Sequence, residues 1–213
     1  MRNTAIGATA ALAVLAGPVT AGPAPAAPAA SAAKKPAKTA SVHGEARISY
    51  VESADDDIRF TVHAEQTPFT RPVLPNAPRG LSTDARGTLK FSHTPRGGAT
   101  GWAEAQVDCL VTSGRTATLT AIVTKSNVEE AGARLGISVQ QGGQGEPDRL
   151  GFSWGVVNVD PGNVDEHGVP VRPQAGTCMA PAPFTTVTKG GFRVVHAEIT
   201  KTPAQPGAAV RRG

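Results

Sequence analysis

The sequence has few aromatic residues and few cysteines, and both shortages limit the kinds of protein it can encode. Phe, Trp and Tyr make up 4% of the 213 residues, and Cys occurs twice. The chain has no P-loop and no G-x-G-x-x-G fingerprint, so neither of the common nucleotide-binding loops is present. Its five histidines show neither an H-x-H nor an H-E-x-x-H spacing. A nucleotide-dependent enzyme and a helix-borne zinc protease are therefore disfavoured.

The first 21 residues have the pattern of a secretory signal peptide. Arg2 supplies a positive charge, residues 5–15 carry none, and Val19 and Ala21 have the spacing that signal peptidase reads. The apolar stretch is too short to cross a bilayer, which takes about 20 residues. We predict a secreted, extracellular protein cleaved after Ala21, with later sites open to residue 33, and no transmembrane segment in the mature chain.

Residues 22–43 are rich in Ala, Pro and Lys and are predicted to form an extended linker, because they offer too little apolar surface to fold. We expect one domain over residues 44–200 and a disordered basic tail over residues 201–213. Seven of the 21 Lys and Arg residues lie outside that domain, which leaves 14 basic against 17 acidic residues within it. The basic linker and tail predict an anionic cell-wall polymer as partner, whereas the acidic domain argues against nucleic acid.

Beyond residue 44 the sequence alternates apolar and polar residues with a period of two, which is typical of half-buried strands. The expected strands cover residues 45–51, 58–65, 87–93, 103–111, 117–123, 135–139, 150–156 and 192–199. Residues 127–133 could form a helical turn, and residues 157–177 form a long loop. The pattern predicts an all-β antiparallel meander of about eight or nine strands, closed as a small barrel or folded as a two-sheet sandwich.

The two cysteines of an exported chain are expected to form one disulfide, Cys109 to Cys178. It would close a loop of about 70 residues, which corresponds to roughly 4 kcal/mol of stability in the chain-entropy picture. Cys109 follows the same alternation as Ala103, Ala105 and Val107. The alternation therefore predicts that Cys109 lies on an inward strand face.

Residues 87–178 contain blocks that resemble a broad set of exported bacterial β-domains. The similar blocks are residues 87–93, 101–114, 117–124, 132–143 and 147–152. The nearest form is found in exported actinobacterial proteins that are labelled hypothetical or repetin. The resemblance implies secretion, a β fold and a cysteine pair, and it carries no catalytic residue. Several such domains have Asp-Asn-Gly-Glu where residues 141–144 here read Gln-Gly-Gly-Gln, which argues against cation binding at that turn.

The densest acidic loop offers Asp160, Asn163, Asp165 and Glu166, followed by His167. Ca²⁺ takes six to eight oxygen ligands, often from one flexible loop. The spacing only partly follows that of an EF-hand, and the closing Glu is missing. These four residues are the candidate Ca²⁺ ligands, but we expect a solvated turn, and no cofactor is required.

Other polar clusters have simple structural interpretations. Asp55, Asp56 and Asp57 occupy an expected hairpin turn, where Asp is favoured for its turn chemistry. A zinc site from His63, His93 and His196 would need strands to converge, and strand histidines more commonly face solvent. Among the aromatics, Trp154 shares the parity of core residues and is expected inside, whereas Trp102 has the opposite parity and is expected outside.

The sequence therefore favours a secreted or cell-wall-proximal, non-enzymatic β-module with a binding or structural extracellular role. One alternative is a barrel that carries a small apolar ligand, which requires a cavity of about 300 Å³ or more. Another is a hydrolase or isomerase whose active site is assembled from distant strands. No catalytic residue is assigned.

Overall fold

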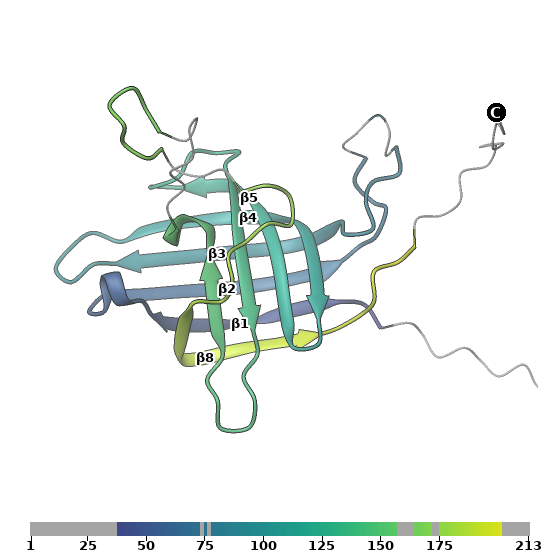
Figure 1. The fold of residues 1–213 in the computed structure, drawn as a ribbon, viewed down its shortest axis with the longest axis horizontal. Helices are drawn as coiled ribbons and strands as arrows, with labels where there is room; N and C mark the ends of the chain where they lie inside the picture. Colours follow the sequence, from purple (N-terminus) through teal and green to yellow (C-terminus); the bar gives the residue numbers. More distant parts are fainter. Residues whose placement is uncertain (1–37, 73–74, 76–77, 157–163, 172–174, 202–213) are drawn as a thin grey trace, which may run out of the picture. The chain divides into compact units, whose positions relative to one another are not determined.

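The computed structural model describes residues 38–72, 75, 78–156, 164–171 and 175–201. Eight antiparallel strands follow one another around a closed barrel, and the last pairs with the first (Figure 1). The strands are β1 (Ser41–Ser49), β2 (Asp57–Gln66), β3 (Ala85–Thr94), β4 (Gly101–Ser113), β5 (Thr116–Ser126), β6 (Arg134–Gln140), β7 (Arg149–Phe152) and β8 (Thr185–Val195). The predicted all-β meander is confirmed, and its closure is a barrel.

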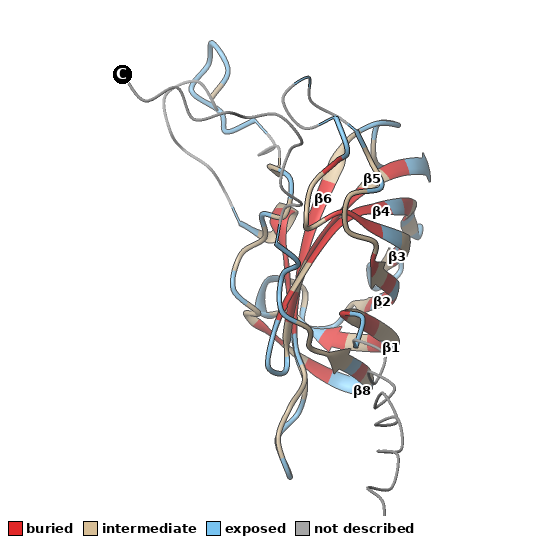
Figure 2. Cartoon of the chain, turned by 90° about the vertical axis from the view of Figure 1, so that its right-hand side faces the viewer, coloured by how far each residue is buried: buried red, intermediate tan, exposed pale blue. Residues whose placement is uncertain are grey.

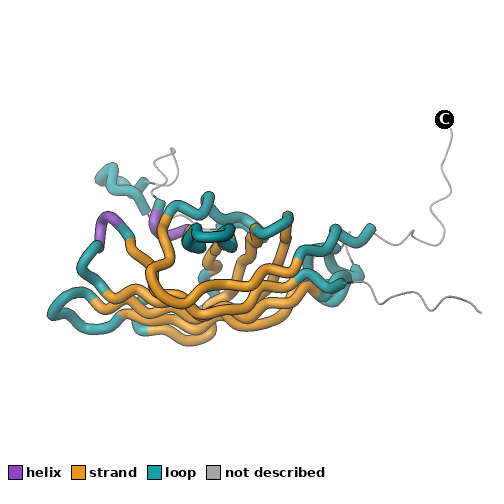
Figure 3. Tube along the Cα trace, turned by 90° about the horizontal axis from the view of Figure 1, so that it is seen from below, coloured by secondary structure: helices purple, strands orange, loops and turns teal. Residues whose placement is uncertain are grey.

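Helix is nearly absent from the described part of the chain. Two short 3₁₀ turns, η1 (Val51–Ser53) and η2 (Ser153–Gly155), lie at the same end of the strands (Figure 3). This end, where β1, β3, β5 and β7 finish, is called the mouth of the barrel below. No helix among the described residues is long and apolar enough to cross a membrane.

Three expected strands have different bounds in the structure. The first strand starts at Ser41 rather than in residues 45–51, and Val42 is fully buried. The last strand runs from Thr185 to Val195 instead of covering residues 192–199. Its first half was missed because Gly190 and Gly191 interrupt the alternation in its middle. The expected strand over residues 150–156 stops at Phe152, where the chain enters η2.

The helical turn expected over residues 127–133 is wrong. Ser126 Oγ does accept hydrogen bonds from the backbone amides of Val128 and Glu129, as a helix cap would. However, the amide of Val123 donates to Ala133 and the amide of Gly132 donates back to Val123. The segment is therefore the connection of a hairpin between β5 and β6, and no helix follows the cap.

The inward faces of the strands form a core of mostly aliphatic side chains. Figure 2 colours the buried residues of the strands red. Small residues are frequent in it, and β5 contributes Ala117, Leu119, Ala121 and Val123 at alternate positions. The largest apolar side chains that are fully buried are Phe60, Leu89, Leu110, Leu119, Ile137, Leu150, Val42, Val62 and Val139. A barrel of eight strands is narrow enough for side chains to fill its interior.

A β-bulge at Asp108 reverses the inward and outward positions of β4. Val107 pairs with Ala121 and Cys109 pairs with Thr120, so Asp108 is an extra residue on its strand. Beyond the bulge Leu110, not Cys109, belongs to the core cluster. The prediction that Cys109 faces inward is therefore wrong, because a one-residue insertion moves the following side chains to the opposite face. Cys109 is nonetheless fully buried.

The seam between β7 and β8 is the shortest strand pairing of the barrel. Only Arg149 with Thr186 and Leu150 with Thr185 pair there. Beyond these two pairs, side chains accept hydrogen bonds from the backbone of β8. Asp148 Oδ2 accepts from the Phe192 amide at 2.6 Å, and Gln141 Oε1 accepts from the Val194 amide at 3.1 Å. The carboxylate of Asp148 thus extends the closure of the barrel beyond β7.

We predict that Asp148→Ala lowers the free energy of unfolding by about 1–3 kcal/mol, because the backbone amides of Phe192 and Gly142 lose their acceptor. Asp148 Oδ1 also accepts from the Gly142 amide at 2.7 Å. Urea unfolding followed by circular dichroism measures the change. Glu146→Ala, in the same turn but exposed, is the matched control. Equal midpoints for the two variants would contradict the role given to Asp148.

Candidate functional site

One part of the outer barrel wall is covered by an irregular segment, residues 178–184, which we call the strap. Cys178 forms the expected disulfide with Cys109, with their Cα atoms 5.4 Å apart, and its amide donates to Thr120 Oγ1 at 3.1 Å. Further along, Ser138 Oγ donates to the carbonyl of Pro181, and Arg149 donates to the carbonyl of Pro183. The strap therefore crosses the outer faces of β5, β6 and β7.

Two glycines allow the strap backbone to lie directly on the sheet. A side chain at Gly136 would place its Cβ 2.1 Å from the carbonyl oxygen of Met179. One at Gly151 would place its Cβ 2.2 Å from the carbonyl oxygen of Ala182. Thr120 and Ser138 are almost fully buried beneath this cover, although they point away from the barrel core. This part of the wall is not available to a partner.

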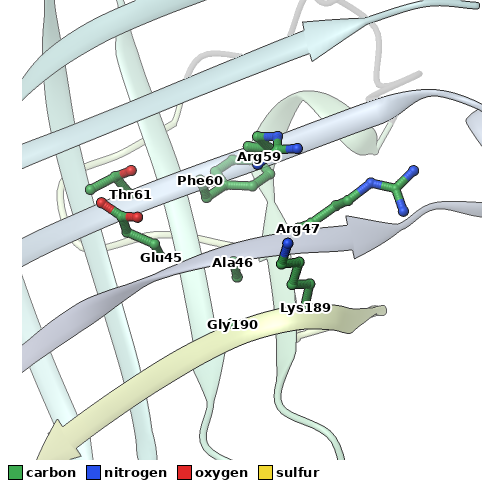
Figure 4. Close-up of a pocket in the computed structure, with 8 residues that line it drawn as sticks. All are labelled: Glu45, Ala46, Arg47, Arg59, Phe60, Thr61, Lys189 and Gly190. Atoms are coloured by element: carbon green, nitrogen blue, oxygen red, sulfur yellow. The ribbon is translucent and has the colours of Figure 1, made fainter.

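The outer faces of β8, β1, β2, β3 and β4 form the rest of the wall, which we call the open wall. Strand register places Lys189 opposite Arg47, and Arg47 opposite Arg59. The same line continues through Ser92 on β3 to Trp102 on β4. Neighbouring strands are about 4.8 Å apart, so the three cations form a row across adjacent strands. Figure 4 shows Arg47, Arg59 and Lys189 on their three strands.

The cation row borders two open pockets on the barrel surface. One, of about 180 Å³, is lined by Glu45, Arg47, Arg59 and Lys189, with the small Gly190 beside them (Figure 4). The other, of about 270 Å³, continues from Arg59 to Trp102. The two pockets share Arg59 and Thr61, and together their lining residues come from five adjacent strands, β8, β1, β2, β3 and β4. Trp102 is 38% exposed, as its parity predicted.

Asp57 holds the two arginines of the row in place. Its Oδ1 accepts from Arg47 Nε at 2.9 Å, and its Oδ2 accepts from Arg59 Nε at 2.8 Å. The hydrogen bond from Arg59, together with that from Arg47, holds the pKa of Asp57 below its usual range. Because one carboxylate serves two guanidinium groups, the row keeps an excess of positive charge. Lys189 adds to that excess.

The predicted Ca²⁺ loop is only partly covered by the structure, since Asp160 and Asn163 lie outside the described residues. Asp165 Oδ1 accepts from the amides of His167 and Val169, both at 2.9 Å, which makes it a turn-forming side chain. Glu166 is exposed and lies 3.5 Å from His167 Nε2. Among the residues that are described, no three of His, Cys, Asp or Glu are grouped so as to hold a metal ion.

The three histidines considered for zinc lie in different places. His63 is on the open wall beside His43, with ring centroids 5.7 Å apart. His93 bonds to Asp56 in the turn between η1 and β2. His196 lies beyond β8 and bonds to Thr112. The barrel does not bring them together.

Sequence reasoning missed one motif. Residues 151–155 read Gly-Phe-Ser-Trp-Gly and match the G-x-S-x-G spacing of α/β-hydrolases. In those enzymes the serine stands on a sharp turn between a parallel strand and a helix. Here Ser153 follows an antiparallel strand, and its Oγ accepts a hydrogen bond from the Gly136 amide at 3.0 Å. Its neighbours Phe152, Trp154 and Gly155 line the mouth pocket. The match does not reproduce the nucleophile elbow.

Two buried carboxylates were also missed, and both are structural. Asp84 Oδ2 accepts from the amides of Thr70, Arg71 and Leu81, which organises the connection between β2 and β3. Asp108, the bulged residue, accepts from Thr120 Oγ1 at 2.6 Å and from Arg134 at 3.1 Å. An isolated Asp in a sequence gives no sign of such partners, which come from strands or loop positions elsewhere in the chain.

Comparison with protein-family models, with curated proteins and with solved structures found no match for the chain. The resemblance to exported actinobacterial proteins therefore stays a prediction. The candidate site rests on the geometry of the barrel wall alone.

We predict that reducing the disulfide lowers the free energy of unfolding by roughly 2–4 kcal/mol, because Cys109 and Cys178 close a loop of 69 residues. Urea unfolding with and without a phosphine reductant measures the loss. The double variant Cys109→Ser/Cys178→Ser is the control and should not respond to the reductant. A wild-type midpoint that reductant leaves unchanged, after alkylation has shown free thiols, would contradict the prediction.

The lowered pKa of Asp57 predicts a pH-dependent contribution to stability. Its ion pairs stabilise the folded state above about pH 4 and are lost as the pH falls through the lowered folded pKa. The difference in unfolding free energy between wild type and Asp57→Asn should therefore shrink toward zero below pH 4. Urea unfolding at pH 7, 5, 4 and 3 measures it. A constant Asp57→Asn difference would refute the assignment.

Proposed function

We propose that this chain is an exported, non-enzymatic β-barrel module that binds an anionic cell-wall polymer on its open wall. The observation that carries the proposal is the register of Lys189, Arg47 and Arg59 on three adjacent strands. A linear polymer with regularly repeated acidic groups is complementary to positive charges repeated along a line. The acidic balance of the domain makes this local excess of positive charge more distinctive.

Two further features support a polymer rather than a small anion. The two neighbouring pockets extend from Lys189 past Arg59 to Trp102, so together they offer several contacts in sequence along one direction. Trp102 presents an exposed indole at its end, and aromatic faces supply apolar contact area to sugar-like or polyol units. Asp57 fixes Arg47 and Arg59, which reduces the entropy lost when a ligand binds.

Export is part of the same proposal. The disulfide between Cys109 and Cys178 is consistent with an oxidising extracellular setting, where such bonds persist. The signal peptide and most of the basic linker and tail lie outside the described residues. In this proposal the flanks add long-range attraction to the polymer, while the open wall supplies the defined contacts.

The two alternatives have less support. The middle of the barrel is packed with side chains, and the pocket at the mouth measures about 150 Å³, about half the roughly 300 Å³ of typical ligand pockets. For a hydrolase or isomerase, two arrangements could serve acid–base chemistry: the pair of His93 and Asp56 at the mouth, and the chain from Thr112 through His196 to Glu198. Neither observation places a substrate, so the polymer-binding module is favoured.

The proposal predicts salt-sensitive binding of the mature protein to immobilised poly(glycerol phosphate). Arg59→Gln/Lys189→Gln should weaken binding roughly tenfold at 20 mM NaCl, because two ionic contacts of modest strength are lost. Raising NaCl to 500 mM should weaken wild-type binding toward the level of the variant. Co-sedimentation or calorimetry measures both effects.

The matched control is Arg115→Gln, which removes one positive charge from the turn between β4 and β5 and leaves the row intact. It should bind as the wild type does. Uncharged dextran serves as the neutral polymer and should not be retained. Wild-type affinity in the double variant, or binding that salt does not weaken, would overturn the proposal.

A further inference from the structure

Aromatic residues are scarce in this chain, yet most of them gather at the mouth of the barrel. Six of the nine form one network of ring contacts: Tyr50, Phe60, Phe91, Phe152, Trp154 and Phe184. Within it the Trp154 ring lies 4.8 Å from that of Phe91, 5.0 Å from that of Phe152 and 5.9 Å from that of Phe60. The rest of the core is built largely from Val, Leu, Ile and Ala.

These rings surround a pocket instead of closing on one another. It has a volume of about 150 Å³, and its walls are formed by aromatic rings together with Ile58, His93 and Gly155. Most of its lining side chains are apolar or aromatic, unlike those of the pockets on the open wall. An apolar cavity of about 150 Å³ is large enough to bind benzene.

The pocket has two polar side chains of note, Tyr50 and His93. The Tyr50 hydroxyl donates to the carbonyl of Gly155 at 3.3 Å, and the orientation of His93 is fixed by a carboxylate. His93 Nε2 lies 2.6 Å from Asp56 Oδ2, and Asp56 Oδ1 accepts from the Arg96 amide at 3.1 Å. The hydrogen bond from His93, followed by that from Arg96, lowers the pKa of Asp56, so this carboxyl is ionised at neutral pH. The carboxylate of Asp56 faces Nε2, so Nε2 donates to it, and Nδ1 is the ring nitrogen left to accept a hydrogen bond when the ring carries one proton.

The lining also limits the charge of a ligand. Its residues include no Lys, Arg, Asp or Glu, and the carboxylate of Asp56 is bound to His93. An anion would find no cation in the wall, and transfer of any charge into an apolar pocket is costly. The favoured ligand is therefore neutral.

We infer that the mouth pocket binds a small, neutral, planar molecule with one hydrogen-bond donor at its edge, of the size of a simple phenol. The rings of Phe91, Phe152 and Trp154 supply the apolar contacts, and His93 accepts the hydrogen bond. This site is separate from the open wall and does not depend on the proposed polymer binding.

The experiment uses the Trp102→Phe variant of the mature protein, in which Trp154 is the remaining tryptophan and reports on the mouth. Phenol, toluene and benzoate are titrated at pH 8 by calorimetry and by tryptophan fluorescence excited at 295 nm. Phenol should bind with a Kd on the order of 0.1–1 mM, as expected for seven non-hydrogen atoms. Toluene should bind roughly five- to tenfold more weakly, since it lacks the donor, and benzoate more weakly still. Trp154 fluorescence should saturate with the calorimetric Kd.

Adding His93→Phe should remove the preference for phenol over toluene while toluene still binds. His63→Phe, a histidine on the open wall, is the matched control and should keep that preference. The comparison of the three probes on Trp102→Phe alone tests the inference without any change inside the pocket. Benzoate binding as tightly as phenol, or phenol binding without a change in Trp154 fluorescence, would overturn it, as would an unchanged preference in folded His93→Phe.

Discussion

Closure at the seam between β7 and β8 is the constraint on which the barrel depends. Seven of the eight strand pairs have longer ladders, whereas this one has two residue pairs, and an open seam would leave two strand edges exposed. The carboxylate of Asp148 and the amide of Gln141 bind backbone amides of β8 beyond those pairs. The strap lies beside the same seam, because Arg149 at the start of β7 donates to the carbonyls of Pro183 and Phe184. Side-chain hydrogen bonds therefore reinforce the shortest strand pairing of the barrel.

The same arrangement divides the outer wall into two parts with different properties. Under the strap, Gly136 and Gly151 let backbone lie on backbone, and polar groups such as Thr120 and Ser138 are buried with their hydrogen bonds satisfied. On the other strands, long charged side chains stand in register, and no described segment covers them as the strap does. A barrel with a narrow, filled interior has two places to bind a partner, its outer wall and its ends. Both candidate sites described above occupy those places.

Local alternation predicted the fold class and most strands, because each strand of this barrel buries one face. It could not predict features that depend on pairing between strands. The bulge at Asp108 adds one residue whose effect is visible only against Thr120 and Ala121 of the partner strand, and so Cys109 was placed on the wrong face. The cation row is hidden for the same reason, since Lys189, Arg47 and Arg59 are far apart in sequence and meet through register. The cysteine pairing was predictable because two thiols allow one intramolecular bond.

The pairing of the first strand with the last also governs when the molecule finishes folding. Thr188 Oγ1 donates to the carbonyl of Arg47 across 141 residues of sequence, so β1 has its second neighbour only after β8 has been made. At a synthesis rate of about 5–20 residues per second, β1 waits on the order of 7–30 s for that partner. Contacts of such high sequence separation also slow folding itself. The barrel of a nascent chain therefore stays open until its C-terminal strand emerges.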